Sequence, residues 1–471
     1  MSEKKQESQE VSRRGFLKYG AAGVVVGAVV GAAGAASYYS GIAPPTTTLT
    51  ETETVTATVA STATVTPTPT ATLGGTFYGS FAPFGPPTDD YVKKIAEDFC
   101  AKRGMTLTWD VIDWAEMDKR LLAMFMAGTA PDVFYTYQNL MGQLIERGFM
   151  TPLDDYLKGS TDLSKHLLPV ALSSGCKWKG KLYGIPLLSG GGMVMYYNKA
   201  LLDKLNIGYP SEGWTIDEFE KTLVDIRDKS SGKTRGWVVP FGEWPAIQRT
   251  FWPIFWNNGG EIVDNVDNPT KITVNSDAGV KTVEWFKRLM DNNSLWKDDL
   301  MLTDATETAA FKDGNTVFIN EAPFTSTAWV QAPVWQTLGA QYFPIGANGT
   351  RYTFAAFDYY SISNTAKNKD LVWQYIENFV LPENAVQYCT PGLFLPPRDD
   401  VQLAPISTPG GPYLAMLAKH PEWMKFYPTV LNGTLIFDRI QKDVQKALLG
   451  AMSPKDALDD AATYGTEQLK G

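Results

Sequence analysis

The feature that most restricts the fold is an alternation of strand and helix patterns over residues 76–135. A short apolar strand pattern at its start is followed by helical spacing, and the order then repeats. The predicted elements are a strand over Thr76–Ser80, a helix over Asp90–Ala101, a strand over Thr106–Ile112, a helix over Glu116–Ala127 and a strand over Pro131–Tyr135. This succession predicts an α/β fold with a largely parallel sheet and right-handed crossovers.

Ligands of such sheets bind beyond the carboxyl ends of the strands. The loops that follow the predicted strands are therefore candidate binding elements. They contain Phe81–Pro87, Trp114 and Tyr137–Asn139.

Composition excludes several classes of function. The 471 residues carry a net charge of -9, which argues against nucleic-acid binding because that function needs a concentrated basic face. Two histidines and three cysteines exclude His-rich metal sites and zinc-ribbon spacings, so we expect no metal and no cofactor. The 58 aromatic residues (14 Trp, 21 Tyr and 23 Phe) are more than ordinary packing requires.

The N-terminal segment has the pattern of an export signal. The adjacent arginines in Ser12–Lys18 precede an uncharged run, Gly20–Ala36, which resembles a twin-arginine signal. Continued to Ile42, the run is long enough for a membrane anchor. From Thr46 to Thr72 there are 14 threonines in 27 residues, a composition that cannot form a core. We expect residues 1–42 to form a signal or anchor and residues 43–73 to form a stalk.

The cysteines are an odd set that is widely spaced in the sequence. Cys100, Cys176 and Cys389 allow at most one disulfide, and the spacing does not select a pair. Three buried free thiols are the equal alternative.

Seven short motifs, in a fixed order after residue 75, resemble one family. They are Ala127–Val133 (AGTAPDV), Gly148–Asp154 (GFMTPLD), Gly180–Pro186 (GKLYGIP), Tyr196–Lys199 (YYNK), Trp214–Phe219 (WTIDEF), Phe311–Val317 (FKDGNTV) and Ser453–Leu458 (SPKDAL). Each motif is weak alone, but the ordered set resembles the extracellular solute-binding proteins of ABC importers, in the family 1 that includes maltose-binding proteins.

The resemblance implies a two-lobed fold of the periplasmic-binding-protein type (type II). Each lobe would be a mainly parallel sheet flanked by helices, and three crossings would join the lobes near residues 188–192, 355–360 and 403–412. Lobe 1 would comprise residues 74–189 and 358–405, and lobe 2 residues 190–357 and 406–471. The implied protein is a monomeric receptor that closes on its ligand, with Gly190–Gly192 as a hinge, and delivers it to an ABC permease.

A sugar offers apolar faces to aromatic rings and hydroxyls to carboxylates, amides and Arg. The segment Glu243–Trp256 interleaves both kinds of side chain, and the resemblance places Phe324 and Phe437 at stacking positions of the family. The candidate ligand-binding residues are Phe81, Phe84, Trp114, Tyr137, Gln138, Asn139, Gly190, Gly191, Glu243, Trp244, Gln248, Arg249, Trp252, Glu321, Phe324, Phe357, Asp358 and Phe437.

Two departures from the family bear on the ligand. Amides at Gln138 and Asn139 stand where maltose binders have charged partners, and Gly191 replaces an acidic residue. The expected ligand is therefore a sugar, and these departures argue against maltose itself.

Two other interpretations remain. A secreted glycoside hydrolase would need two carboxyl groups about 5–10 Å apart, for which Glu243, Glu321 and Asp358 are candidates without a supporting motif. A receptor for a non-sugar solute, such as a peptide or a phosphate ester, would show more Lys and Arg in the aromatic segments. We therefore expect a non-catalytic sugar receptor.

Overall fold

The computed structural model describes residues 74–470, apart from 115, 174, 191, 402, 404–410 and 418–419. The expected signal or anchor (1–42) and stalk (43–73) lie outside the described residues, as does Gly191. Among the described residues, no helix is both long enough and apolar enough to cross a bilayer.

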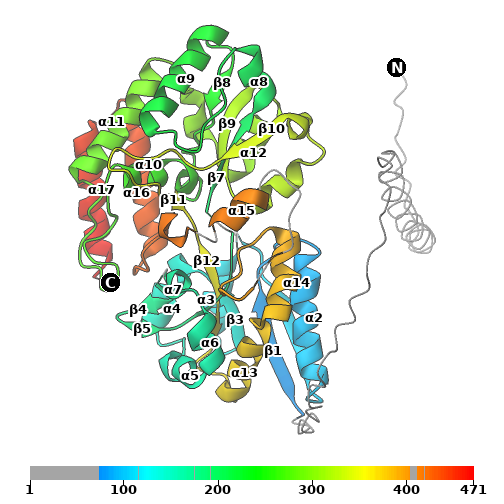
Figure 1. Cartoon of the computed structure of the whole chain (residues 1–471). Helices are drawn as coiled ribbons and strands as arrows, with labels where there is room; N and C mark the ends of the chain where they lie inside the picture. The colour runs from blue at the N-terminus through cyan, green and yellow to red at the C-terminus, as the bar shows by residue number, and fades with distance from the viewer. Residues whose placement is uncertain are drawn as a thin grey trace, which may run out of the picture. The chain divides into compact units, whose positions relative to one another are not determined.

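The first lobe is built on a five-stranded sheet (Figure 1). Its strands, in spatial order, are β2 (Thr106–Val111), β1 (Thr76–Phe81), β3 (Val133–Thr136), β12 (Phe357–Ile362) and β6 (Ile185–Ser189). The longer helices of this lobe are α2 (Thr88–Ala101), α3 (Met117–Met126), α4 (Gln138–Glu146), α13 (Lys369–Phe379) and α14 (Pro382–Gly392). The predicted strand–helix alternation over residues 76–135 is confirmed.

The second lobe is built on a four-stranded sheet. Its strands, in spatial order, are β10 (Leu338–Gln341), β7 (Val194–Asn198), β9 (Thr316–Glu321) and β8 (Arg235–Trp237). The helices of this lobe are α9 (Ile216–Ser230), α10 (Phe251–Asn257), α11 (Asp277–Asp291), α12 (Asp304–Lys312), α16 (Gly433–Leu448) and α17 (Pro454–Gln468).

Short α-helices and two small strand pairs lie between these larger elements. They are α5 (Asp154–Gly159), α6 (Thr161–His166), α7 (Pro169–Ser173), α8 (Lys199–Lys204), α15 (Gly411–Leu417), the pair β4 (Lys177–Trp178) and β5 (Lys181–Leu182), and the pair β11 (Thr353–Phe354) and β13 (Met424–Lys425).

The helix starts follow the capping residues in the sequence. At α9 the Thr215 hydroxyl accepts from the Glu218 amide, and the Glu218 carboxylate accepts from the Thr215 amide at 2.8 Å. Ser453 caps α17, and Pro454 is its first residue. Both starts have the residue patterns that favour a helix N-terminus, a capping box at Thr215 and a serine cap followed by proline at Ser453.

The expectation of mainly parallel sheets is wrong in detail, because both sheets are mixed. Within these two sheets of the described chain, the parallel pairs are β1–β2, β1–β3 and β8–β9, whereas β12 runs antiparallel to both β3 and β6. In the second sheet β7 is antiparallel to β9 and β10. The physical reason is the route of the chain: β12 enters its sheet from the other lobe and not through a crossover helix, so no helix fixes its direction.

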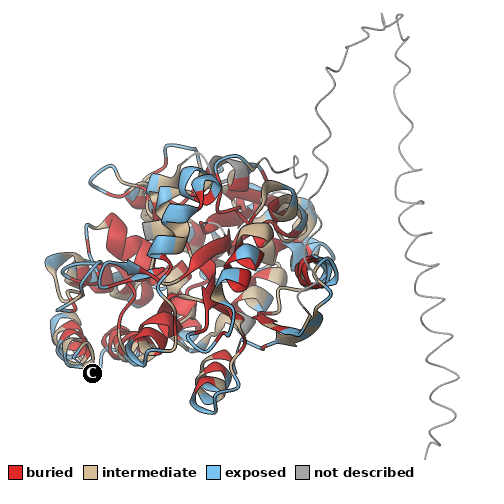
Figure 2. Cartoon of the chain, turned by 90° about the horizontal axis from the view of Figure 1, so that it is seen from below, coloured by how far each residue is buried: buried red, intermediate tan, exposed pale blue. Residues whose placement is uncertain are grey.

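Each sheet has its own apolar core, and Figure 2 shows the strands in the interior largely as buried, with exposed residues on the outer helices and loops. The chain passes between the lobes after β6 and again between β11 and β12. The first passage is held by paired backbone hydrogen bonds between Ser189 and Leu395 (2.9 and 2.8 Å) and by the Met193 amide bonding the Phe354 carbonyl (3.0 Å). The crossing segments are therefore tied to one another.

The three cysteines are buried and unpaired, so no disulfide joins Cys100, Cys176 and Cys389. The sequence left open either one disulfide or three free thiols, and the structure has three free thiols.

Candidate functional site

Aromatic side chains gather where the first-lobe strands end. Phe81, Phe84, Trp114, Tyr135 and Tyr137 follow or end β1, β2 and β3, and Phe394 joins them; we call these six the first-lobe aromatic group. The Phe84 ring lies edge-on to Trp114 at 5.3 Å and to Tyr135 at 5.9 Å, measured between ring centroids. Trp114 lies edge-on to Tyr135 at 5.6 Å. The group sits at the carboxyl ends of the parallel strands, as expected for a ligand site.

Three rings of this group keep accessible surface. Trp114 is 43 % exposed, and Phe84 and Tyr137 are half-buried. The Trp114 indole N–H donates to the Pro83 carbonyl at 2.9 Å, which fixes the orientation of the ring. A tryptophan held in place with nearly half of its surface exposed is available to stack on a ligand.

Asp358 supplies a carboxyl group beside these rings. It lies on β12, at the irregularity between Asp358 and Tyr359 in the pairing with β6, and is only 9 % exposed. Burial raises the pKa of its carboxyl group to about 7, and the Tyr135 phenol opposes that shift. The Tyr135 hydroxyl faces Asp358 without forming a hydrogen bond of good geometry. Within the described chain no Lys, Arg or His forms an ion pair with Asp358.

A second carboxyl group borders the rings. The Tyr137 phenol donates a hydrogen bond to the Asp118 carboxylate, and Asp118 lies in the first turn of α3. Burial raises the pKa of Tyr137, and the charges of Asp118 and Asp358 raise it further. Tyr137 therefore stays a neutral phenol that is hydrogen-bonded to Asp118.

In the second lobe, Arg249 is surrounded by carboxylates. Its Nε donates to Glu321 Oε1 at 2.6 Å, its Nη1 lies 3.0 Å from Glu307 Oε1, and it also pairs with Asp304. Glu243 Oε1 accepts from the Asp304 amide at 2.9 Å. We call these five residues the arginine cluster.

Burial dominates the electrostatics of this cluster. It lowers the pKa of Arg249, but the charges of Asp304, Glu321 and Glu307 outweigh burial and raise it well above its usual value. Burial raises the pKa of Glu307 and of Glu321, and the Arg249 charge only partly opposes this. Arg249 is therefore a permanently charged and fully engaged cation.

Phe324 connects the two lobes. It follows β9, is half-buried and packs against both main cores. Its ring lies 5.4 Å from that of Phe394 in the first-lobe aromatic group. A Cβ added at Gly190 would lie 3.1 Å from Phe324 Cε1, so a glycine there allows the ring to approach the crossing segment.

Several sequence-predicted residues are not part of these groups. Trp252 and Phe437 are fully buried, and Trp244, which is half-buried, stacks on Phe437 at 5.8 Å; all three rings belong to the second-lobe core. Rings without an exposed face cannot stack on a ligand in this conformation, so Trp252 and Phe437 have a packing role here.

Four other predicted residues also lie apart. Gln138 and Asn139 are buried in the first turn of α4, against Gly175 and Gly433 respectively. Phe357 is buried and stacks on Phe426 at 5.8 Å. Gln248 is half-buried beside Arg249.

The structure adds residues that the sequence prediction missed. They are Asp118, Tyr135, Asp304, Glu307 and Phe394. Two signals were present: Tyr135 and Tyr137 are separated by the strand period of two, and Asp304 and Glu307 are three apart at a helix start.

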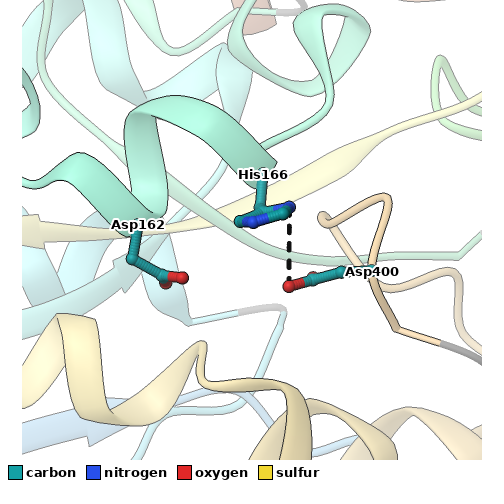
Figure 3. A group of neighbouring side chains, drawn as sticks. All are labelled: Asp162, His166 and Asp400. Carbon is teal, nitrogen blue, oxygen red and sulfur yellow. Dashed lines mark ion pairs between the residues drawn. The ribbon is translucent and has the colours of Figure 1, made fainter.

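A separate group of two aspartates and one histidine has the donor types of a metal site. Asp162, His166 and Asp400 bring donor atoms within 4.8 Å of one another (Figure 3). However, the fully buried Arg398 side chain pairs with Asp162 at 2.7 Å and with Asp400 at 2.8 Å. The carboxylates already have a cation, so we interpret the group as an ion-pair network.

A cavity of about 190 Å³ lies elsewhere between the lobes. It is lined by Gly175 and Lys177 of the first lobe and by Trp256, Glu261 and Tyr427 on the other side. No sequence-predicted site residue lines it, and Lys425 and Glu261, both in its wall, pair with each other at 2.5 Å.

Comparisons with known proteins identify the family. A family model described as bacterial extracellular solute-binding protein matches residues 94–411. A binding protein of Brucella abortus is 23 % identical over 390 residues, which cover 83 % of this chain and 92 % of that protein. The maltotriose-binding protein of Pyrococcus abyssi is 22 % identical over 276 residues, which cover 56 % of this chain and 54 % of that protein.

Solved structures show the same fold. The GacH receptor of Streptomyces glaucescens, studied unliganded and with acarbose, has a TM-score of 0.69 and 21 % identity, covering 84 % of this chain and 99 % of that one. MalE3 of T. maritima, solved with maltose, has a TM-score of 0.68 and 18 % identity, covering 83 % and 99 %. The predicted two-lobed α/β fold is confirmed, and the chain belongs to the bacterial extracellular solute-binding protein family.

Proposed function

We propose that this protein is the extracytoplasmic receptor of an ABC importer, which binds a di- or oligosaccharide between its lobes without altering it and delivers it to a membrane permease. Family membership supports the receptor role. Relatives of similar fold are named for maltotriose or were solved with maltose or acarbose, which supports a sugar ligand.

The observation that carries the sugar proposal is the exposed, oriented indole of Trp114. Its neighbours Phe84 and Tyr137 are half-buried rings, and Asp118 and Asp358 add carboxyl groups. Apolar sugar faces would stack on the rings, and sugar hydroxyls would donate to the carboxylates.

Calorimetric titration of the full chain with a panel of mono- and oligosaccharides tests the proposal. A true ligand should also raise the melting temperature, because binding to the folded state adds RT ln(1 + [L]/Kd) to stability. Trp114→Ala should weaken binding at least tenfold. Tyr209→Ala removes a similarly exposed ring (48 %) outside the site and should leave affinity unchanged. Equal effects of the two variants, or no sugar bound, would overturn the proposal.

The absence of catalysis belongs to this proposal. Of the carboxyl groups considered for a hydrolase, Glu321 is held by Arg249 in the second lobe, whereas Asp358 lies on a strand of the first sheet. Incubation with the bound oligosaccharide should return it unchanged. Release of shorter sugars would assign the site to a hydrolase.

Domain limits and location complete the proposal. Lobe 1 would comprise residues 74–189 and 358–405, and lobe 2 residues 190–357 and 406–471, in a monomer that closes about Gly190–Gly192. Residues 1–42 would direct twin-arginine export and anchor the protein through the stalk at 43–73. Replacing Arg13 and Arg14 with lysine should retain the protein inside the cell, as fractionation would show.

A further inference from the structure

We propose that the sugar bound by this receptor carries a protonated amine, which the Asp358 carboxylate and the first-lobe aromatic group bind together. The inference rests on the proposed sugar-binding function and narrows its ligand class to amino sugars.

The first support is a buried carboxyl group without a cation. Asp358 is 9 % exposed, and within the described residues no Lys, Arg or His pairs with it. The Tyr135 hydroxyl interacts with Asp358, belongs to a residue that is 1 % exposed, and lacks a well-formed hydrogen bond. Buried carboxylates are normally paired with a cation, and Asp358 has only the Tyr135 phenol beside it, so a ligand can supply the missing cation.

The second support is the kind of surface around Asp358. Tyr135 and Tyr137 both interact with its charge, and Trp114 lies 5.6 Å from Tyr135 and 6.3 Å from Tyr137. Aromatic faces attract cations through the ring quadrupole, and a desolvated cation gains most. The pairing of Tyr359 with Thr136 places Asp358 beside Tyr137 at this edge of the sheet, and rings beside a carboxylate favour an ammonium group over a hydroxyl group.

The third support is the balance of charge. Two carboxyl groups, Asp118 and Asp358, lie beside the first-lobe aromatic group. The arginine cluster adds four more and one arginine: Glu243, Asp304, Glu307, Glu321 and Arg249. Arg249 is already held by three carboxylates, and the nearby Arg120 pairs with Asp110 at 3.0 Å. An anionic ligand would find no free cation in these groups, and a neutral one would leave Asp358 uncompensated.

The chemistry of recognition follows. The ammonium group of an amino sugar would donate hydrogen bonds to the Asp358 carboxylate and rest against the Trp114 and Tyr137 rings. N-acetylation removes the charge and adds bulk at the same nitrogen. It should therefore abolish this contact, while the rest of the sugar still stacks.

The test uses the full chain and three probes: the β-1,4-linked glucosamine disaccharide, its N,N′-diacetyl form and maltose. At pH 7, calorimetry should show the free amine bound at least tenfold tighter than either neutral probe. At pH 6, free Asp358 is mostly protonated, because burial raises its pKa to about 7. Binding the ammonium group should then release about one proton per ligand, measured in buffers of different ionisation enthalpy.

Two variants separate charge from structure. Asp358→Asn should abolish both the tenfold preference and the proton release. Asp132→Asn alters another partly buried carboxyl group of the first lobe, at the opposite end of β3, and should leave both unchanged.

The outcomes are distinguishable. Equal or tighter binding of a neutral probe by the unmodified protein would overturn the amine inference and leave the sugar receptor standing. If none of the three probes binds and the wider sugar panel also fails, the proposed function itself is overturned. Amine preference that survives Asp358→Asn would place the cation elsewhere and refute the role of Asp358.

Discussion

Asp358 should make the unliganded protein less stable as the pH rises. Burial raises the pKa of its carboxyl group from 3.8 to about 7 in the folded chain. Between these two values the folded state holds a proton that the unfolded state has lost. The free energy of unfolding therefore falls with rising pH in this window, by about 1.4 kcal/mol per pH unit, and reaches a total penalty of about 4 kcal/mol above pH 7.

Asp358→Asn removes this titration while keeping the size of the side chain. The free energy of unfolding of the variant minus that of the parent should rise by about 2–3 kcal/mol between pH 5 and pH 8. Any cost of burying the asparagine amide is the same at both pH values and cancels in this comparison.

Urea unfolding followed by tryptophan fluorescence at pH 5 and pH 8 measures the effect. Asp370→Asn, which neutralises an exposed carboxylate of the first lobe, is the control and should give a nearly constant difference between the two pH values. If the Asp358→Asn profile ran parallel to that of the parent, Asp358 would be already ionised or paired, and the reasoning would be refuted.

Three further predictions concern the second lobe and the crossing. Arg249→Met should cost about 3–5 kcal/mol of unfolding free energy in urea titrations, since Glu321 and Glu307 lose their cation; a cost under 1 kcal/mol would contradict this. Glu307→Gln should cost under about 1 kcal/mol at pH 7, because Arg249 keeps Asp304 and Glu321 as partners and burial disfavours the charged form of Glu307; a larger loss would show that its charge is needed. Gly190→Ala should displace Phe324 and weaken sugar binding several-fold in calorimetry, whereas Gly213→Ala, with no atom within 4 Å of the added Cβ, should not.

The order of strands and helices in the first lobe was predictable because its signals are local. Period-two and period-3.6 patterns and capping residues act within one element, and Thr215 with Glu218 marked the start of α9 in the sequence. Strand direction was not predictable in this way. The pattern of β12 is the same for either direction, and its antiparallel pairing follows from its arrival from the other lobe.

Residues of the candidate site were named from the sequence where an aromatic residue lies in the loop after a strand, as at Trp114 after β2 and Tyr137 after β3. The spacing of Asp304 and Glu307 predicts only that they share one side of a helix. Their contacts with Arg249 span 55 or more positions, and no local pattern predicts such contacts. Trp252 is the opposite case. The helix α10 is buried on all sides, so aromatic residues at helical spacing pack the core although the same spacing would suit a binding wall.

The arginine cluster and Asp358 differ in whether the protein itself supplies a cation to the buried carboxyl groups. In the arginine cluster the protein supplies its own cation, and the pKa of Arg249 is raised accordingly. Asp358 has no such partner within the described chain, and keeping it costs the free protein about 4 kcal/mol at neutral pH. A cationic ligand would recover that penalty on binding, whereas a neutral sugar would not. The same buried charge that destabilises the empty receptor would thus discriminate between ligands, by the penalty that only a cation removes.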